Sequence, residues 1–189
     1  MTTDTASRST TGRSALATSS LWIAGVAALC VGGSYVYACA APFAAIAAIG
    51  ATRMDRNTGL MLVIVAWLVN QAIGFAVLDY PQTATTFAWG IAIGIAAIVG
   101  YAAARTIATA GQPPVLTLAL TFVAAFVIYE TALYGASFAL GGSDYAFTIE
   151  IVGYILKINA AAFAVLLILH RAAIALPWLR PAAPAPTAA

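Results

Sequence analysis

The stretch ACAAPFAAIAAIGATR, residues 38–53, decides how many times this chain crosses a bilayer. An apolar helix over residues 38–52 would be only about 22 Å long at 1.5 Å per residue. A helix needs about 20 residues to cross a hydrocarbon core of roughly 30 Å. The stretch is therefore either a short second span or the end of one long helix over residues 20–50.

The placement of arginine favours the short second span. With six spans and a cytoplasmic N-terminus, the cytoplasmic side receives Arg8, Arg13, Arg53, Arg56, Arg105, Arg171 and Arg180. The loops on the other side then carry Asp79 and Asp144 and no Lys or Arg. With five spans the arginines divide between the two sides, against the positive-inside rule. Gly32, Gly33 and Pro42 also oppose one continuous helix.

Composition and the remaining apolar stretches give the rest of the architecture. The chain is 63% hydrophobic and 7% charged, whereas soluble domains average about 25% charged residues. We therefore predict an all-α, multi-pass bundle in the cell (inner) membrane, with both termini cytoplasmic. The predicted spans are 20–37, 38–52, 60–78, 84–104, 115–138 and 147–170. Flexible tails over 1–19 and 177–189 flank this transmembrane domain of residues 20–176.

The N-terminal region has a second interpretation. Arg8 and Arg13, the apolar core that follows them, and the triplet Ala38-Cys39-Ala40 imitate the three regions of a secretory signal peptide. A small-residue triplet is common in a chain so rich in alanine, so we keep residues 20–37 as a span.

Polar side chains inside the spans are the candidates for function, because each is costly in lipid. Three predicted helices carry such groups at similar depth, between the midplane and the outer face. Helical spacing joins them to aromatic residues on the same faces. The predicted substrate-binding residues are Trp67, Asn70, Gln71, Glu130, Tyr154 and Lys157. We expect them to line a small-ligand pocket that opens outward.

The charged pair in this set has two interpretations. Lys157 lies near the predicted midplane and needs an anion or a wet cavity there. Glu130 is the expected partner, since Glu150 is two turns away on the helix of Lys157 itself. The two charges either neutralise each other and lock helices together, or flank a ligand. Asn159 points away from the Lys157 face, and we expect it to serve packing.

The sequence shows no enzymatic constellation. His170 is the only histidine, so no haem or di-metal site can be completed from histidine pairs. Cys30 and Cys39 have neither a metal-ligand spacing nor a disulfide framework. A net charge of +2 with scattered basic residues does not predict nucleic-acid binding. We predict no enzyme activity, no cofactor and no metal.

Small residues on the first predicted span suggest a partner helix. Ala24, Ala28 and Gly32 recur at every fourth position, a spacing that lets two helices approach closely. Gly90 and Gly94 repeat the spacing on the fourth span, where we expect internal packing.

Together these features resemble the substrate-capture subunits (S-components) of energy-coupling factor vitamin transporters. The resemblance rests on six spans within 189 residues, the small-residue face of the first span and polar groups in the outer half. The stretches APFAAI (residues 41–46) and WLVNQAIGF (residues 67–75) are similar to sequences of such proteins. The resemblance implies that Ala24, Ala28 and Gly32 contact a transmembrane coupling subunit, and that separate ATPase subunits drive transport. No vitamin-specific motif is present.

Two functions remain open from the sequence. The first is a membrane transport component that captures a small polar or zwitterionic, vitamin-like molecule from outside. The alternative is a non-catalytic structural or assembly subunit of a larger membrane complex, in which the polar groups join helices. An outward cavity would favour the first, and a filled interior with paired polar groups the second.

Overall fold

The computed structural model describes residues 41–142 and 144–175, and within them it is all-α. The helices are α2 (Phe43–Arg53), α3 (Arg56–Ala76), α4 (Ala84–Ala108), α5 (Pro114–Leu140) and α6 (Ile149–Ala175), with a 3₁₀ turn η1 (Asp144–Phe147) before α6. Four of them, α3 to α6, are long and apolar enough to cross a membrane. The chain therefore has the build of a multi-pass membrane protein.

The described helices match the predicted spans closely. The spans expected over 60–78, 84–104, 115–138 and 147–170 correspond to α3, α4, α5 and α6. The short second span expected over 38–52 corresponds to α2, which begins after Pro42. The predicted first span 20–37, with Ala24, Ala28 and Gly32, and both predicted tails lie outside the described residues.

Local sequence sets where the helices start and stop. Asp55 precedes α3 and accepts hydrogen bonds from the backbone N–H groups of Asn57 and Thr58, both at 3.1 Å. Hydrogen bonding from Thr58 holds the pKa of Asp55 below its usual value. Thr83 caps α4 by accepting from the Thr86 N–H at 3.2 Å. Gly141 ends α5 with φ of 70°, a conformation that glycine adopts without steric cost.

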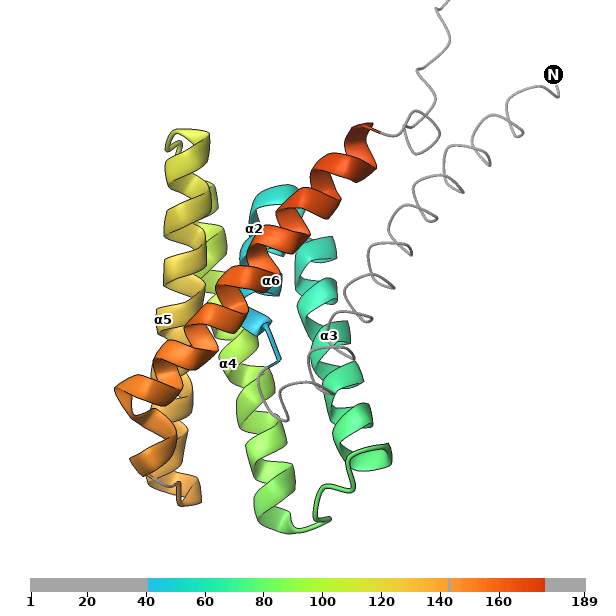
Figure 1. Ribbon diagram of the computed structural model, residues 1–189, viewed down its shortest axis with the longest axis vertical. Helices are drawn as coiled ribbons and strands as arrows, with labels where there is room; N and C mark the ends of the chain where they lie inside the picture. Colours follow the sequence, from blue (N-terminus) through green and yellow to red (C-terminus); the bar gives the residue numbers. More distant parts are fainter. Residues whose placement is uncertain (1–40, 143, 176–189) are drawn as a thin grey trace, which may run out of the picture.

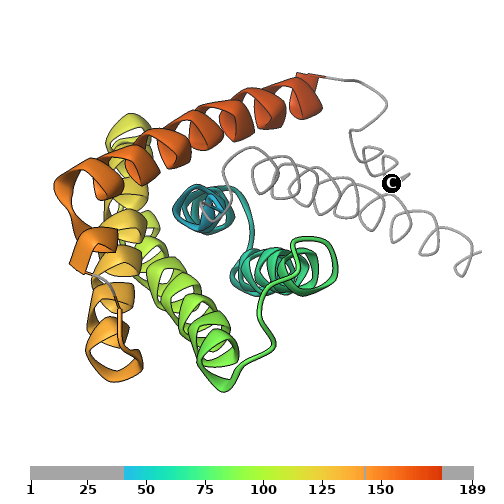
Figure 2. The ribbon, with the colours of Figure 1, turned by 60° about the horizontal axis from the view of Figure 1, so that its bottom comes forward.

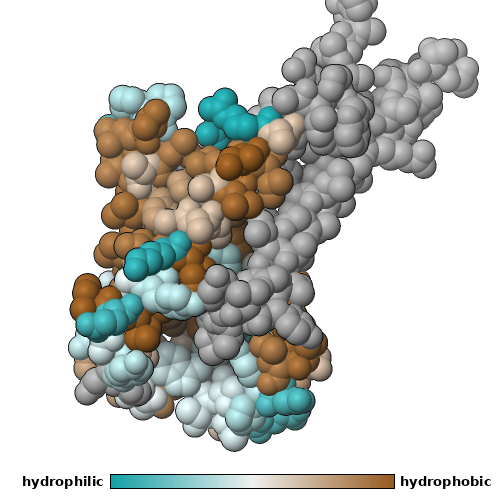
Figure 3. Space-filling model, in the orientation of Figure 1, coloured by the Kyte–Doolittle hydropathy of each residue, from teal (hydrophilic) through white to brown (hydrophobic). Residues whose placement is uncertain are grey.

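The four long helices run alternately up and down (Figure 1). The turns between α2 and α3 and between α4 and α5 lie at one end of the bundle, with the C-terminal end of α6. The turns between α3 and α4 and between α5 and α6 lie at the other end. Figure 3 shows hydrophobic side chains over most of the upper body, with hydrophilic ones at the upper rim and towards the lower end.

Helix α2 forms the centre of the bundle. It packs against α3, α4, α5 and α6 (Figure 2), and every residue from Phe43 to Ala51 is buried. Its alanines let the neighbouring helices come close, while Phe43, Ile46 and Ile49 fill the space between them. At Gly59 a Cβ atom would lie only 2.6 Å from the Gly50 carbonyl oxygen, so α2 and α3 touch backbone to backbone.

A buried helix of eleven residues must still satisfy the backbone groups at its ends. At its start, Asn159 of α6 accepts hydrogen bonds from the N–H groups of Ala44 (3.1 Å) and Ala45 (3.3 Å). The Asn159 amide in turn donates to the Ile155 carbonyl at 3.1 Å. Asn159 is fully buried. The sequence predicts only a packing role for Asn159, whereas the structure shows that it also caps α2.

The other end of α2 is held by α4. The Arg105 guanidinium donates from Nη1 to the carbonyls of Ala51 (2.8 Å) and Met54 (2.9 Å). The Tyr101 hydroxyl, one turn earlier on α4, donates to the Arg56 carbonyl at 2.8 Å. Asn159 of α6 and Arg105 of α4 thus cap the two ends of α2.

We predict that replacing Asn159 by Ala destabilises the fold. The change leaves two buried N–H groups of α2 without acceptors, and each unsatisfied group costs about 1–3 kcal/mol. Thermal unfolding of the purified protein in detergent should show a clear fall in Tm. Asn57→Ala is the matched control, because the Asn57 side chain is exposed. Equal Tm values for the two variants would contradict the capping role.

Candidate ligand cavity

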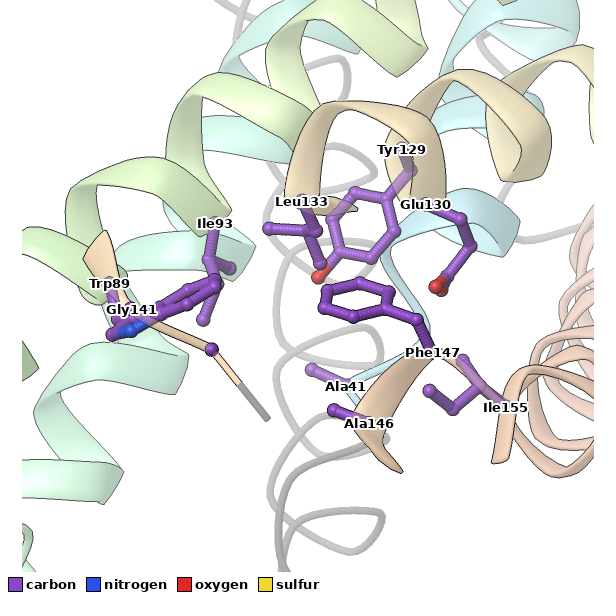
Figure 4. A pocket seen from close by; sticks show the side chains of 11 residues that line it. Ala41, Trp89, Ile93, Tyr129, Glu130, Leu133, Gly141, Ala146, Phe147 and Ile155 are labelled. Carbon is purple, nitrogen blue, oxygen red and sulfur yellow. The ribbon is translucent and has the colours of Figure 1, made fainter. Parts of the chain in front are cut away.

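The structure contains a cavity of about 380 Å³ between α4, α5, η1 and α6 (Figure 4). This volume lies within the range of about 300–1,000 Å³ that is typical of small-molecule sites. The lining residues are Ala41, Trp89, Ile93, Tyr129, Glu130, Leu133, Gly141, Gly142, Ala146, Phe147 and Ile155. The cavity therefore begins next to the first residue of α2 and extends towards the α5–α6 connection.

Helical spacing brings the lining residues together. Trp89 and Ile93 are one turn apart on α4, and Tyr129 and Leu133 are one turn apart on α5. Gly141 ends α5, and the following turn η1 places Phe147 back against that helix. The Phe147 ring meets Tyr134 edge to face at a centroid distance of 5.2 Å.

The wall is mostly apolar and aromatic, with one carboxyl group. Glu130 is the acidic residue of the lining, and its Oε1 atom is buried without a hydrogen-bond partner. Figure 4 shows its carboxyl group beside the Phe147 ring. Tyr129 is buried and its ring packs on Phe43 at 5.8 Å. Among the described residues that line the cavity, none is basic.

Of the six predicted substrate-binding residues, the cavity includes only Glu130. Trp67 and Gln71 instead lie at the contact between α3 and α4. The Trp67 indole donates to the Gly90 carbonyl at 2.8 Å, and Gln71 donates to the side-chain oxygen of Asn70 at 3.3 Å. Gly90 and Gly94 make room for the Gln71 and Trp67 side chains respectively, as the internal-packing interpretation of these glycines expects.

The two predicted site residues on α6 are exposed. Tyr154 and Lys157 both lie on the outer surface of this helix. Within the described chain, Lys157 does not form an ion pair with Glu130. A ligand-binding role for Lys157, Tyr154 and the α3 residues stays a prediction.

Sequence reasoning missed most of the cavity. Trp89, Tyr129 and Phe147 were not singled out, because aromatic residues in an apolar span look like ordinary packing. The residue before Glu130 was one available signal, since Tyr129 adds a hydroxyl next to the only carboxyl group in the middle of α5. The part played by η1 could not be foreseen, because residues 139–146 read only as a polar loop.

Comparisons with protein-family models, with curated proteins and with solved structures find no match to this chain.

We predict that Gly94 is required for packing of α3 on α4. A Cβ atom at this position would lie 2.7 Å from Cε2 of the Trp67 ring, and such overpacking costs about 1–3 kcal/mol. Gly94→Ala should therefore lower the Tm of the purified protein. Gly153→Ala on α6 is the control, because no atom lies within 4 Å of a Cβ there. It should leave the Tm unchanged or raise it slightly, by helix propensity. If Gly94→Ala is as stable as Gly153→Ala, the contact is looser than described.

Proposed function

We propose that this protein is a membrane-embedded subunit that captures a small molecule from the outer side for transport. The cavity carries the proposal, since it is of ligand size and holds a carboxyl oxygen without a partner. The chain would act with a separate transmembrane coupling subunit and ATPase subunits, in the manner of S-components of energy-coupling factor transporters.

The distribution of charge supports an outward-facing site. Arg53, Arg56, Arg105 and Arg171 gather at the end of the bundle that holds the α2–α3 and α4–α5 turns. At the opposite end, the α3–α4 and α5–α6 connections carry Asp79 and Asp144 and no basic residue. By the positive-inside rule, the arginine end is cytoplasmic. Six spans with both termini cytoplasmic, in the cell (inner) membrane, fit this orientation.

The lining supports a ligand with a largely apolar body. Trp89, Ile93, Leu133 and Phe147 offer no charge, and Glu130 supplies an acid with no basic residue among the described residues of the lining. A zwitterionic ligand held between Glu130 and Lys157 would need Lys157 to turn inward from its exposed position on α6. Of the polar and zwitterionic ligands that the sequence left open, the lining therefore favours a molecule with one polar group.

A second candidate function, a structural subunit of a larger membrane complex, is favoured by α6. Helix α6 runs obliquely across the other helices (Figure 1) and exposes Lys157 together with Ile149 and Ile168. A charge on a membrane-facing surface is costly, and a partner helix that pairs with the charge would reduce that cost. The two functions are compatible, because a capture subunit also needs a partner in the membrane.

The topology can be tested by cysteine labelling. In a protein with Cys30 and Cys39 replaced by Ser, we expect an impermeant maleimide added to intact cells to label Gln82→Cys and not Asn57→Cys. Both positions are exposed in the fold, so reactivity depends on the side of the membrane. Permeabilised cells should label both variants, which controls for accessibility. Labelling of position 57 from outside would contradict the proposed orientation.

The cavity can be tested by filling it. Ala146 lines the cavity at η1, so Ala146→Trp should block a ligand without adding charge. Native mass spectrometry of the protein purified in mild detergent should show a bound small molecule that Ala146→Trp loses. The control is Ala139→Trp, the same change at an exposed position of α5, which should retain it. A bound mass that survives Ala146→Trp, or a wild-type protein without any bound molecule, would count against the proposal.

A further inference from the structure

We propose that the ligand of this cavity is an organic amine, bound as its ammonium form with an aromatic or aliphatic body. The inference rests on the proposed function and adds the chemical class of the ligand. It depends on Glu130, on the aromatic residues around it and on the backbone groups that adjoin the cavity.

Glu130 places a carboxyl group in the wall of the cavity. Buried polar atoms in proteins are almost always hydrogen-bonded, and leaving a carboxyl oxygen without a partner is costly. Here Oε1 of Glu130 is buried and has no partner. No Lys, Arg or His is among the described residues of the lining. The Glu130 carboxyl group is thus the acidic acceptor that the described wall offers to a molecule in the cavity.

The aromatic residues favour a cationic donor. Trp89, Tyr129 and Phe147 line the same cavity, and the faces of such rings attract ammonium groups, most strongly when water is excluded. A hydrogen bond from an ammonium to a carboxylate is also about twice as strong as one between neutral groups. An amine uses both features, whereas an alcohol uses only the hydrogen bond.

The backbone next to the cavity argues against an anionic ligand. The buried N-terminus of α2 follows Ala41, and free N–H groups there could hold an anion. They are already used: Phe43 donates to the Ala41 carbonyl at 2.8 Å, and Ile46 donates to the Pro42 carbonyl at 3.1 Å. The N–H groups between them are taken by Asn159. An anion would thus meet the Glu130 carboxyl group without a basic side chain among the described lining residues and without free N–H groups at the start of α2.

Three probes of similar size separate the classes: phenethylamine, phenethyl alcohol and hydrocinnamate, which carry an ammonium, a hydroxyl and a carboxylate on a phenyl-alkyl body. Isothermal titration of each into the protein in nanodiscs, with empty nanodiscs subtracted, gives the affinities. We expect phenethylamine to bind at least about tenfold more tightly than phenethyl alcohol, and hydrocinnamate not to bind, because charge-assisted hydrogen bonds are the stronger ones.

Variants identify the group responsible. Glu130→Gln keeps the shape of the side chain and should weaken phenethylamine at least about tenfold, while leaving phenethyl alcohol nearly unchanged. Glu150→Gln removes a carboxyl group from the exposed start of α6 and should change neither affinity. The comparison of the three probes on the wild-type protein does not depend on how well any variant folds.

The outcomes separate this inference from the proposed function. Alcohol or carboxylate binding as tight as amine binding, or amine binding unchanged in Glu130→Gln, overturns the assignment of an amine. If Ala146→Trp still blocks the binding of these probes, the cavity remains the ligand site and the proposed function stands. If none of the three probes binds, the amine assignment fails, while the fate of the co-purified molecule in Ala146→Trp decides the proposed function.

Discussion

The fold depends on the two side chains that cap a half-length helix in the middle of the bundle. Helix α2 is too short to reach both surfaces of a bilayer, so its first N–H groups lie deep inside the protein. In an apolar interior such groups are tolerated only when other protein groups satisfy them. Asn159 accepts from two of these N–H groups at the start of α2, and Arg105 donates to two carbonyl groups at its end. These bonds connect α2 with α6 on one side and with α4 on the other.

The same half-length helix accounts for the cavity. Helix α2 fills the interior near the arginine end, where its small side chains let α3, α4 and α5 pack closely. Beyond its first turn there is no central helix among the described residues, and the space next to Ala41 is bounded by α4, α5, η1 and α6. A full-length second helix would occupy this space. The short helix α2 thus leaves room for a ligand on the side away from the arginines.

Much of the fold could be predicted from the sequence, because lipid imposes simple constraints on length and composition. The spans predicted over residues 60–78 and 84–104 follow from hydropathy, and the helices α3 and α4 cover nearly the same residues. The candidate site was harder. Trp67 and Gln71 look like ligand groups in sequence, yet Gly90 and Gly94 accommodate them at a helix contact. Only a three-dimensional arrangement distinguishes a polar group that faces a cavity from one that faces another backbone.

The central claim is that the first amides of α2 are hydrogen-bonded inside the bundle, and hydrogen exchange tests it most directly. Amides in the first turn of a helix usually exchange quickly, because they have no partner within the helix. With the protein in nanodiscs, the account predicts that the amides of Ala44 and Ala45 exchange far more slowly than those of Ala84 and Thr85 in the first turn of α4. In Asn159→Ala the amides of Ala44 and Ala45 should lose this protection, while the rates at Ala84 and Thr85 stay the same. Equally fast exchange at all four amides in the wild-type protein would contradict the claim.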